Sequence, residues 1–344
     1  MSPENRMGWL VLAVVLSAAP LSAQVVTGAI SGRVTDNTGA VIPGATVQVQ
    51  NVETGLARNA QSGAAGRYEV RNLPPGSYTV TVQQTGFQTL VRSGITLSVA
   101  SEVAVNVELN VGAVAERVEV TAEAAAIETT NAAISNLVTP TQMRDLPLNG
   151  RSIDQLAMLT PGVVQQTNVN PGAFFGTGVR LVINGSRPTQ VLYLLDGTVT
   201  NDYNMSGPGG VAQVSLGVEA VREFRILTHS YSAEYGRNSG GVFSSITRSG
   251  TNELHGSAYE FVRNNIFDAR DFFNLARAPN PSPLPPFRRN QFGASLGGRV
   301  VRDKVFFFLN YEAIRQRQQL AGVGTVPDLN ARQGLLADPV PVAP

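Results

Sequence analysis

The sequence reads GAISGRVTDNTGAVIPGATVQVQNVETG from Gly28 to Gly55. Apolar and polar residues alternate in two runs of this stretch, Ile30–Val34 and Val47–Gln50, and turn-forming residues separate the two runs. An alternation with a period of two residues places one face of a strand in a core and the other face in water. The stretch therefore predicts short strands of a protein built mainly from β-sheet.

The same alternation continues as far as Leu109. It recurs at Tyr78–Gln83 and Val103–Leu109, and Pro and Gly mark a turn at Leu73–Gly76. Short strands of this kind, about seven at a spacing of about 8–12 residues, are typical of a β-sandwich. We expect this sandwich to occupy residues 24–110.

Three aromatic residues of this region, Tyr68, Tyr78 and Phe87, allow two interpretations. Exposed rings would offer stacking surfaces to a sugar, whereas buried rings would fill the core between the two sheets. We expect all three rings to pack in the core.

The composition excludes several classes of function. The 344 residues include 26 Lys and Arg against 25 Asp and Glu, and the net charge of +1 gives no electrostatic basis for binding nucleic acid. There is no cysteine, so disulfide scaffolds, cysteine nucleophiles and thiolate metal sites are excluded. The two histidines, His229 and His255, lack the acidic neighbour of zinc-hydrolase motifs. We expect a protein that is not an enzyme and that needs no cofactor.

Residues 1–23 have the features of a cleaved export signal. Arg6 precedes an apolar run, Trp9–Ala19. This run is shorter than the roughly 20 residues that span a bilayer, but it matches a signal-peptide core of about 7–15 residues. Small residues favour cleavage between Ala23 and Gln24. A buried helix or a membrane anchor is the alternative, and we expect export.

The composition changes in residues 111–131, where small residues and glutamates replace bulky apolar ones, as in a linker. One short part of this linker, Glu116–Ala122, has an extended character. An exposed strand can add to the edge of a partner's sheet through backbone hydrogen bonds. The candidates for such a contact are Val118, Glu119, Val120, Thr121 and Ala122. The alternative is that the stretch forms a last strand of the sandwich.

Residues 132–249 predict a mixed α/β domain. Ile153, Leu156 and Ala157 follow helical spacing, and Pro161-Gly162 ends this helix. Four apolar strands are expected in VRLVING, VLYLLDG, VREFRILTH and GGVFSSITRSG, which begin at Val179, Val191, Val221 and Gly240.

Two short motifs in this domain are spelled like binding sites. Asp196-Gly197 with Asp202 suggests a cation site, but the ligand series of a calcium loop is missing. Asn184-Gly185-Ser186 spells a glycosylation site. We expect both motifs to be tight turns and expect no metal.

After residue 249 the pattern changes to one typical of outer-membrane strands. Alternating runs occur at His255–Asn265 and Asn290–Val300, and Asp303–Gln318 is rich in aromatic residues. Outer-membrane strands are about 10 residues long and carry aromatic residues at the membrane interfaces. The proline-rich residues 279–286 are expected to form a loop. Residues 250–344 therefore predict the start of a transmembrane β-barrel; the alternative is a soluble sandwich, in which an exposed run such as Val305–Leu309 would promote aggregation.

Several stretches resemble known families. GAISGRVTDNTGAVIPGATVQVQNVETG with GRYEVRNLPPGSYTVTVQQTGFQ is similar to the carboxypeptidase regulatory-like domain, which implies a non-catalytic transthyretin-like or carbohydrate-binding-like sandwich. Three further stretches are similar to the plug of TonB-dependent receptors: LPLNGRSIDQLAMLTPGV, NGSRPTQVLYLLDGTVTNDY and VREFRILTHSYSAEYGRNSGGVFSSITRSGTNELHGSAYEF. FRRNQFGASLGGRVVRDKVFFFLNYEAIRQRQ looks like the opening of the barrel in the Oar-like branch, where such a sandwich precedes the plug.

This resemblance implies an outer-membrane receptor that imports a substrate with energy passed on by TonB. Val118–Ala122 resembles the TonB box, which implies contact with the C-terminal domain of TonB. The imported ligand stays open among iron chelates, carbohydrates and peptides. The alternative from another class is a secreted carbohydrate-binding or adhesive module built on the sandwich.

The length of the chain limits its membrane part. A plugged transporter barrel has about 22 strands, which need roughly 220 residues at about 10 residues each. Residues 250–344 provide only about three strand candidates. We therefore expect an incomplete barrel in a chain that is the N-terminal part of a receptor. Its expected location is the outer membrane, or the periplasm for a truncated chain.

Overall fold

The computed structural model describes residues 28–112, 117–121, 132–146, 148, 151, 153–166, 180–201, 207, 216–236, 238–269, 286–318 and 332. The described residues fall into two compact units. The first lies within residues 1–257 and 294–311, and the second within residues 258–293 and 312–344. No helix among the described residues is long and apolar enough to cross a membrane.

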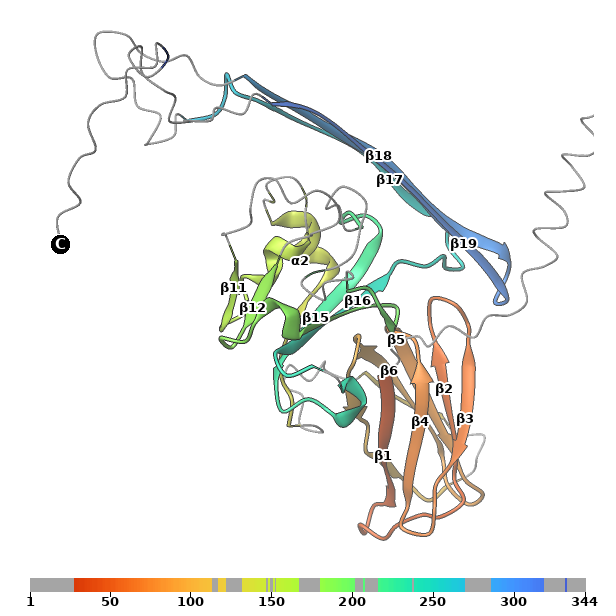
Figure 1. The fold of residues 1–344 in the computed structure, drawn as a ribbon. Helices are drawn as coiled ribbons and strands as arrows, with labels where there is room; N and C mark the ends of the chain where they lie inside the picture. Colours follow the sequence, from red (N-terminus) through yellow and green to blue (C-terminus); the bar gives the residue numbers. More distant parts are fainter. Residues whose placement is uncertain are drawn as a thin grey trace, which may run out of the picture. The chain divides into compact units, whose positions relative to one another are not determined.

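The N-terminal part of the first unit is a sandwich of two sheets (Figure 1). One sheet contains β4 (Arg67–Leu73), β1 (Gly28–Asp36), β7 (Glu102–Ala104) and β8 (Val107–Leu109). The other has the order β3 (Ala57–Gln61), β2 (Thr46–Asn51), β5 (Gly76–Gln83), β6 (Thr89–Leu97) and β9 (Arg117–Thr121). This arrangement confirms the predicted sandwich.

The alternating residues of these strands form the sandwich core. Strand β5 alternates buried and half-buried residues along most of its length, because successive side chains point to opposite faces of a sheet. Tyr68 and Tyr78 are 3% and 0% exposed, and Phe87 is half-buried against the same core. The prediction that these aromatic residues pack inside is confirmed.

The next part of the first unit is a mixed α/β domain around a five-stranded sheet. The order of the sheet is β10 (Ile134–Val138), β15 (Val221–His229), β16 (Gly241–Thr247), β13 (Val191–Leu195) and β14 (Thr198–Val199). A separate two-stranded sheet pairs β11 (Val163–Gln165) with β12 (Leu181–Ile183). The short helices are α2 (Pro140–Asp145), α3 (Asp154–Ala157), η1 (Pro188–Gln190) and η3 (Ala233–Tyr235).

Both faces of the five-stranded sheet are buried at its inner strands, β13, β15 and β16. Val191 and Tyr193 of β13 belong to one apolar cluster, and Leu192 and Leu194 belong to a second. A strand covered on both faces has a continuous apolar sequence instead of an alternating one. This explains the run VLYLL, and the four strands predicted from such runs are confirmed as β12, β13, β15 and β16.

Helix α2 begins at a strong local signal. Thr139 accepts a hydrogen bond from the Gln142 backbone N–H, and the Gln142 side chain accepts one from the Thr139 N–H. This reciprocal capping box, with Pro140 in the first turn, satisfies backbone donors that would otherwise lack partners. Met143 then turns its side chain into the core of the domain.

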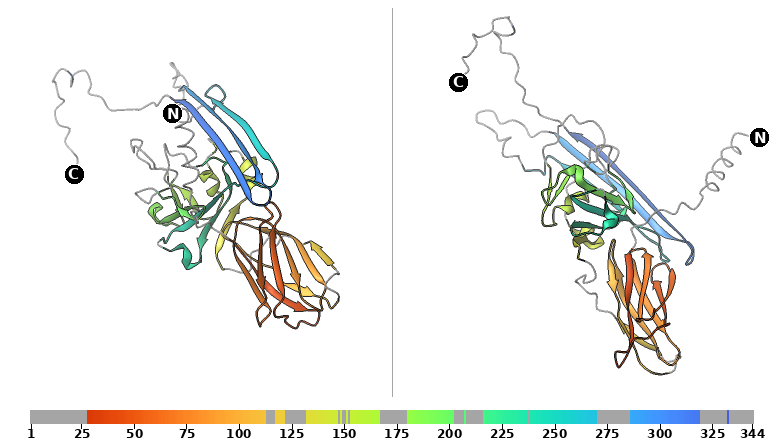
Figure 2. Two further views of the ribbon diagram at one scale, coloured as in Figure 1. Left: turned by 90° about the vertical axis from the view of Figure 1, so that its right-hand side faces the viewer. Right: turned by 60° about the horizontal axis from the view of Figure 1, so that its bottom comes forward.

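The last three strands form their own sheet, in the order β17 (His255–Asn264), β18 (Phe287–Val301) and β19 (Val305–Gln318). They run side by side as one curved ribbon in both views of Figure 2. The predicted strands near 255–265, 290–300 and 303–318 are present, but β18 begins earlier, at Phe287. The proline-rich residues 279–285 lie outside the described residues, as does the whole predicted signal peptide with Ala23 and Gln24.

Candidate functional site

Strand β9 contains most of the predicted partner-binding stretch. It pairs in parallel with β6, from Thr89 opposite Arg117 to Ser93 opposite Thr121. Val118 is half-buried and Glu119 is exposed. Ala122 lies outside the described residues. The stretch is therefore extended, as predicted, and its place at the edge of the sandwich sheet matches the alternative prediction of a last sandwich strand.

The chain is guided to this edge by backbone contacts that precede β9. Gln88 N–H donates to the Asn110 carbonyl at 2.9 Å, and Gly112 N–H donates to the Gly86 carbonyl at 3.2 Å. These bonds keep the chain beside the start of β6. Sequence reasoning did not find this route, because the bonds join backbone groups and leave no side-chain pattern.

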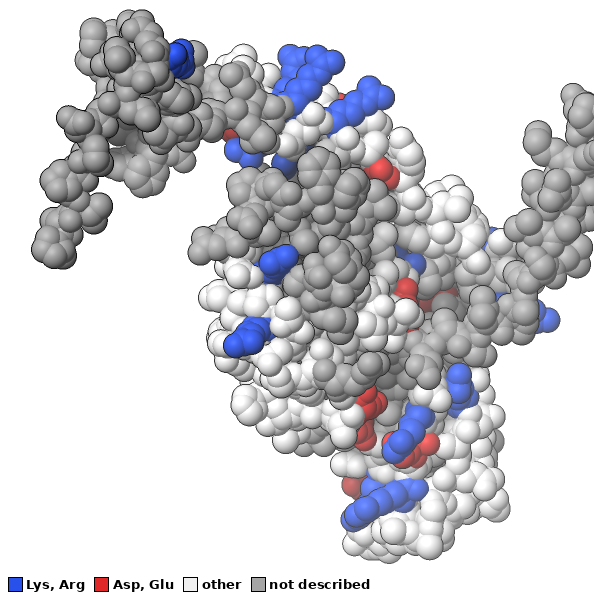
Figure 3. All heavy atoms as spheres, viewed as in Figure 1, with Lys and Arg blue, Asp and Glu red and all other residues white. Residues whose placement is uncertain are grey.

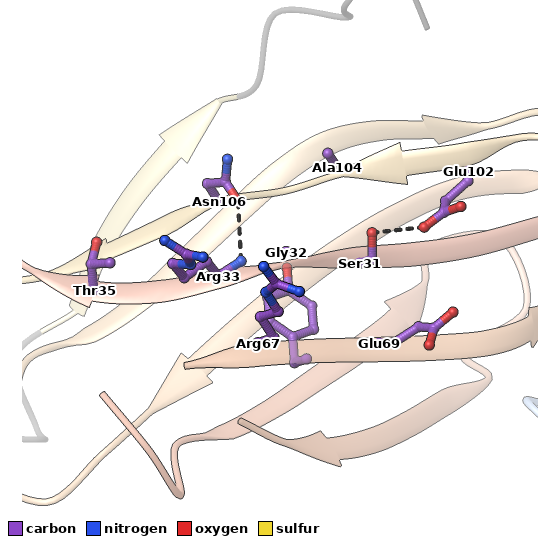
Figure 4. Close-up of a pocket in the computed structure, with 10 residues that line it drawn as sticks. Ser31, Gly32, Arg33, Thr35, Arg67, Glu69, Glu102, Ala104 and Asn106 are labelled. Carbon is purple, nitrogen blue, oxygen red and sulfur yellow. Dashed lines mark hydrogen bonds between the residues drawn. The ribbon is translucent and has the colours of Figure 1, made fainter. Parts of the chain in front are cut away.

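An open groove of about 870 Å³ lies on the other sheet of the sandwich (Figure 4). Two hydrogen bonds cross it, from the Ser31 hydroxyl to Glu102 at 3.0 Å and from the Arg33 N–H to Asn106 at 3.0 Å. Its wall also includes Tyr68, whose ring is buried and whose hydroxyl donates to the Val105 carbonyl at 2.6 Å. The ring is therefore unavailable for stacking on a sugar.

A buried ionic cluster lies in the α/β domain around Glu219. One Glu219 oxygen is 3.2 Å from Arg151 Nη2, and the other is 3.5 Å from Arg248 Nη1. The second oxygen also accepts a hydrogen bond from the Ser257 hydroxyl at 3.0 Å. Burial lowers the pKa of Arg248. The Glu219 carboxylate therefore contacts three segments of the chain: the loop before α3 through Arg151, the end of β16 through Arg248 and the start of β17 through Ser257.

Two glutamates connect the sandwich with β15 inside the first unit. Arg222 donates to both oxygens of Glu53, at 3.0 and 3.2 Å. The neighbouring residue Glu223 is 7% exposed and accepts a hydrogen bond from the Val99 N–H. Burial raises the pKa of Glu223, and the Val99 hydrogen bond opposes this shift only in part.

Sequence reasoning missed both of these charged clusters. The signal that was available is the presence of charged residues in otherwise apolar segments, such as Arg222 and Glu223 at the start of VREFRILTH. Charged residues are seldom buried unless they are paired. The identity of the partners could not be predicted, because they are distant in the chain.

The described residues of the two motifs that are spelled like binding sites form turns, and Asp202 lies outside the described residues. Asp196 and Gly197 both have positive φ, 49° and 81°, and they connect β13 to β14 as a two-residue hairpin loop. The Asp196 carboxylate accepts hydrogen bonds from the N–H and hydroxyl of Thr247. Asn184 also has a positive φ, 51°, and its amide donates to the Thr228 carbonyl. Among the described residues, no group of three or more potential ligands is placed to hold a metal ion.

The sheet of β17, β18 and β19 exposes large apolar side chains. Several apolar residues of its three strands are more than half exposed: Val262 63%, Val300 65%, Leu309 64% and Tyr311 64%. Apolar side chains on the outer face of long antiparallel strands are the mark of a membrane-facing barrel surface. In contrast, the face shown in Figure 3 has positive and negative side chains intermingled over the sandwich.

A sandwich, a plug-like α/β domain and membrane-type strands in this order are typical of the class of outer-membrane receptors with a plugged barrel. Three family models match in the same order: the carboxypeptidase regulatory-like domain at residues 29–110, the TonB-dependent receptor plug domain at 126–242, and the outer membrane beta barrel domain at 246–343.

Within this class, the chain is an Oar-like TonB-dependent receptor sequence. It is 31% identical over 272 residues to the TonB-dependent transporter Oar of Myxococcus xanthus. The match covers 74% of this chain, and the chain spans 24% of the length of that relative. The barrel is not closed by the three strands that the structure describes.

Among solved structures, the siderophore receptor PirA of Acinetobacter baumannii is 23% identical, with 52% of this chain and 24% of that chain covered at a TM-score of 0.38. A catechol 1,2-dioxygenase of Acinetobacter radioresistens is 18% identical, with 30% and 60% covered at a TM-score of 0.22. Overlaps of this size assign no function to the chain. The family itself is a class of transporters and not of enzymes, and it belongs to the outer membrane.

Proposed function

We propose that this chain supplies the sandwich, the plug and the first barrel strands of a transporter that takes up a ligand across the outer membrane with energy from TonB. The observation that carries the proposal is the direct passage from plug to membrane-type sheet. Strand β16 ends at Thr247, and β17 begins at His255. The Glu219 cluster joins the two elements through Ser257, so the plug is bound to the first barrel strand.

The proposed contact with TonB is the stretch Val118–Ala122. Strand addition needs an extended segment that can pair with the edge of the partner's sheet; β9 is extended and is the last strand of its sheet among the described residues. Strand β10 follows β9 along the chain and is itself the edge strand of the plug sheet. A pull on β9 would therefore reach the plug first at β10, which is held by its pairing with β15, by the hydrogen bond from Asn136 to Thr160 and by Val138 in the core.

The proposal includes export through residues 1–23 with cleavage between Ala23 and Gln24, because the apolar run there has the length of a signal-peptide core. The imported ligand stays open among iron chelates, carbohydrates and peptides. The rival proposal of a carbohydrate-binding module loses its main support, since the rings of Tyr68 and Tyr78 are buried.

The proposal is tested by photo-crosslinking in living cells. Val118 is replaced by a photoreactive amino acid, and Val52, which is 63% exposed in a sandwich turn, is replaced in the same way as the control. We expect a crosslink to TonB from position 118 and none from position 52. No TonB adduct from position 118, with the protein present in the outer-membrane fraction, would contradict the proposal.

A further inference from the structure

The groove on the sandwich sheet of β4, β1, β7 and β8 has two ends of opposite charge. Figure 4 shows Arg33 of β1 and Arg67 of β4 at one end, and Glu69 and Glu102 at the other. The residues that line the groove between these ends are small and include Ser31. The groove can therefore accommodate an elongated ligand whose own two ends carry opposite charges.

The arginine end has no counter-ion among the described residues. Arg33 and Arg67 are direct partners in the antiparallel register of β1 and β4. Like charges directly opposite each other destabilise a sheet. The ion pairs within the described part of the chain involve other arginines, and Glu108, which is in register with Thr35, pairs with neither Arg33 nor Arg67. An anion bound between the two guanidinium groups would relieve their repulsion.

Asn106 completes the arginine end. Its side-chain oxygen accepts a hydrogen bond from the Arg33 N–H at 3.0 Å, and its backbone carbonyl accepts one from Arg92 Nη1 at 3.0 Å. These two bonds hold the amide beside Arg33. Guanidinium groups bind carboxylates and phosphates through paired N–H donors in a planar fork. The arginine end therefore suits an anion of either kind.

The glutamate end distinguishes between these anions. Glu69 lies opposite Ser31 in the register, and Glu102 accepts a hydrogen bond from the Ser31 hydroxyl at 3.0 Å. Ser31 and Arg33 are two residues apart, which corresponds to about 7 Å along a strand. Carboxylates at this distance repel a doubly charged phosphate more than a singly charged carboxylate, and they attract an ammonium group. Glu69 also pairs with Arg71, but an exposed ion pair of this kind contributes little and exchanges readily.

We propose that the groove binds a short zwitterionic peptide, with its carboxylate between Arg33 and Arg67 and its ammonium group beside Glu69 and Glu102. An extended chain spans about 3.3–3.6 Å per residue. A dipeptide therefore spans about 7 Å, which matches the spacing of the two ends of the groove. The site is separate from the stretch Val118–Ala122 of the proposed function, so the failure of either proposal leaves the other standing.

Saturation-transfer NMR of the ligand, with the full chain in detergent, tests the site. The probes are dialanine, its N-acetylated form, which lacks the ammonium group, its C-amidated form, which lacks the carboxylate, and inorganic phosphate. We expect saturable binding of dialanine, several-fold weaker binding of the acetylated form and at least tenfold weaker binding of the amidated form.

Three results of this titration would overturn the proposal. Without saturable binding of dialanine there is no peptide site in the groove. Phosphate bound as tightly as dialanine would show a general anion site instead. Equal binding of dialanine and its acetylated form would show that the glutamate end does not contact an ammonium group.

Arg67→Gln in the full chain tests the arginine end. The matched control is Arg58→Gln, which changes an exposed arginine on β3 of the other sheet. We expect Arg67→Gln to weaken dialanine binding at least tenfold and Arg58→Gln to leave it unchanged. Arg67→Gln also removes a like-charge contact, so its melting temperature should not fall below that of the parent. Equal affinities of the two variants, or weaker binding of Arg67→Gln together with a lower melting temperature, would contradict a binding role for Arg67.

Glu102→Gln tests the opposite end of the groove. This variant should bind dialanine about as weakly as the parent binds the acetylated form, because the charge that attracts the ammonium group is reduced. Its affinity for the acetylated form should not fall. A preference for dialanine over the acetylated form that is as large as in the parent would contradict the contact between Glu102 and the ammonium group.

Discussion

Among single residues, Glu219 is expected to contribute strongly to the stability of the plug, although its sequence context does not indicate this. Its carboxylate has two arginine partners and one serine partner in a nearly closed environment, with only 10% of its side chain exposed. A buried charge is costly unless its partners remain. Removal of the carboxylate would leave Arg151 and Arg248 facing each other without their shared counter-ion.

We therefore expect Glu219→Gln to weaken the plug by roughly 3 kcal/mol, in line with the loss of one member of a buried pair. Amide hydrogen exchange along β15 and β16 of the full chain would show this loss as faster exchange. The control is Glu69→Gln, whose partner Arg71 is mostly exposed and which should change stability by less than about 1 kcal/mol. Equal effects of the two substitutions would contradict the importance of the cluster.

Glu223 gives a prediction about pH. Its pKa is raised in the folded chain, first of all by burial, above the ordinary value of 4.5. The stability that comes from this shift is fully present below the ordinary pKa and is lost as the pH rises through the raised pKa. Glu223→Gln should therefore melt at a temperature close to that of the parent in acid and at a higher temperature near neutral pH.

The measurement is the melting temperature of parent and variant from pH 4 to pH 8. Because all other titratable groups are the same in the two proteins, the difference between their melting temperatures reports on Glu223 alone. If the melting temperature of the variant does not rise above that of the parent as the pH increases, the prediction is wrong. The partners of the Glu223 carboxylate would then stabilise its charged form more than burial destabilises it.

Among the secondary-structure elements, the strands that could be predicted are those whose pattern of apolar residues follows from their burial. Strand β15 was expected at Val221–His229 and lies there, because a strand buried on both faces is apolar throughout. The partner of β9 could not be predicted, since parallel pairing with β6 depends on backbone groups that every sequence shares. The charged partners of Glu219 could not be predicted either, because they are up to 68 residues away in the sequence.

The sandwich is expected to fold by itself. Residues 25–110 contain the whole core cluster from Ile30 to Leu109 and exclude β9. This fragment should melt cooperatively and give a dispersed amide spectrum, because its turns are local and its core is complete. A fragment of residues 25–124, which adds β9, should melt within a few degrees of it, since β9 contributes little. An unfolded shorter fragment beside a folded longer one would show that β9 is part of the domain.

At the scale of the whole molecule, the strands after residue 249 should govern solubility. They expose apolar side chains along a sheet in which, among the described strands, β17 and β19 each pair with β18 alone, and exposed edge strands promote association. We expect residues 24–249 to stay in solution without detergent and residues 24–344 to float with phospholipid vesicles. Recovery of residues 24–344 in the lipid-free fraction would contradict a membrane role for β17, β18 and β19.

In the proposed function, a TonB-type partner engages the backbone of the stretch that contains β9. The most direct measurement is a calorimetric titration of the full chain with a TonB C-terminal domain, compared for Val120→Pro and Val120→Ala. Proline removes a backbone donor, whereas alanine keeps it. We expect at least tenfold weaker binding for Val120→Pro and nearly unchanged binding for Val120→Ala. Equal affinities of the parent and Val120→Pro would show that TonB does not pair with the backbone of this stretch.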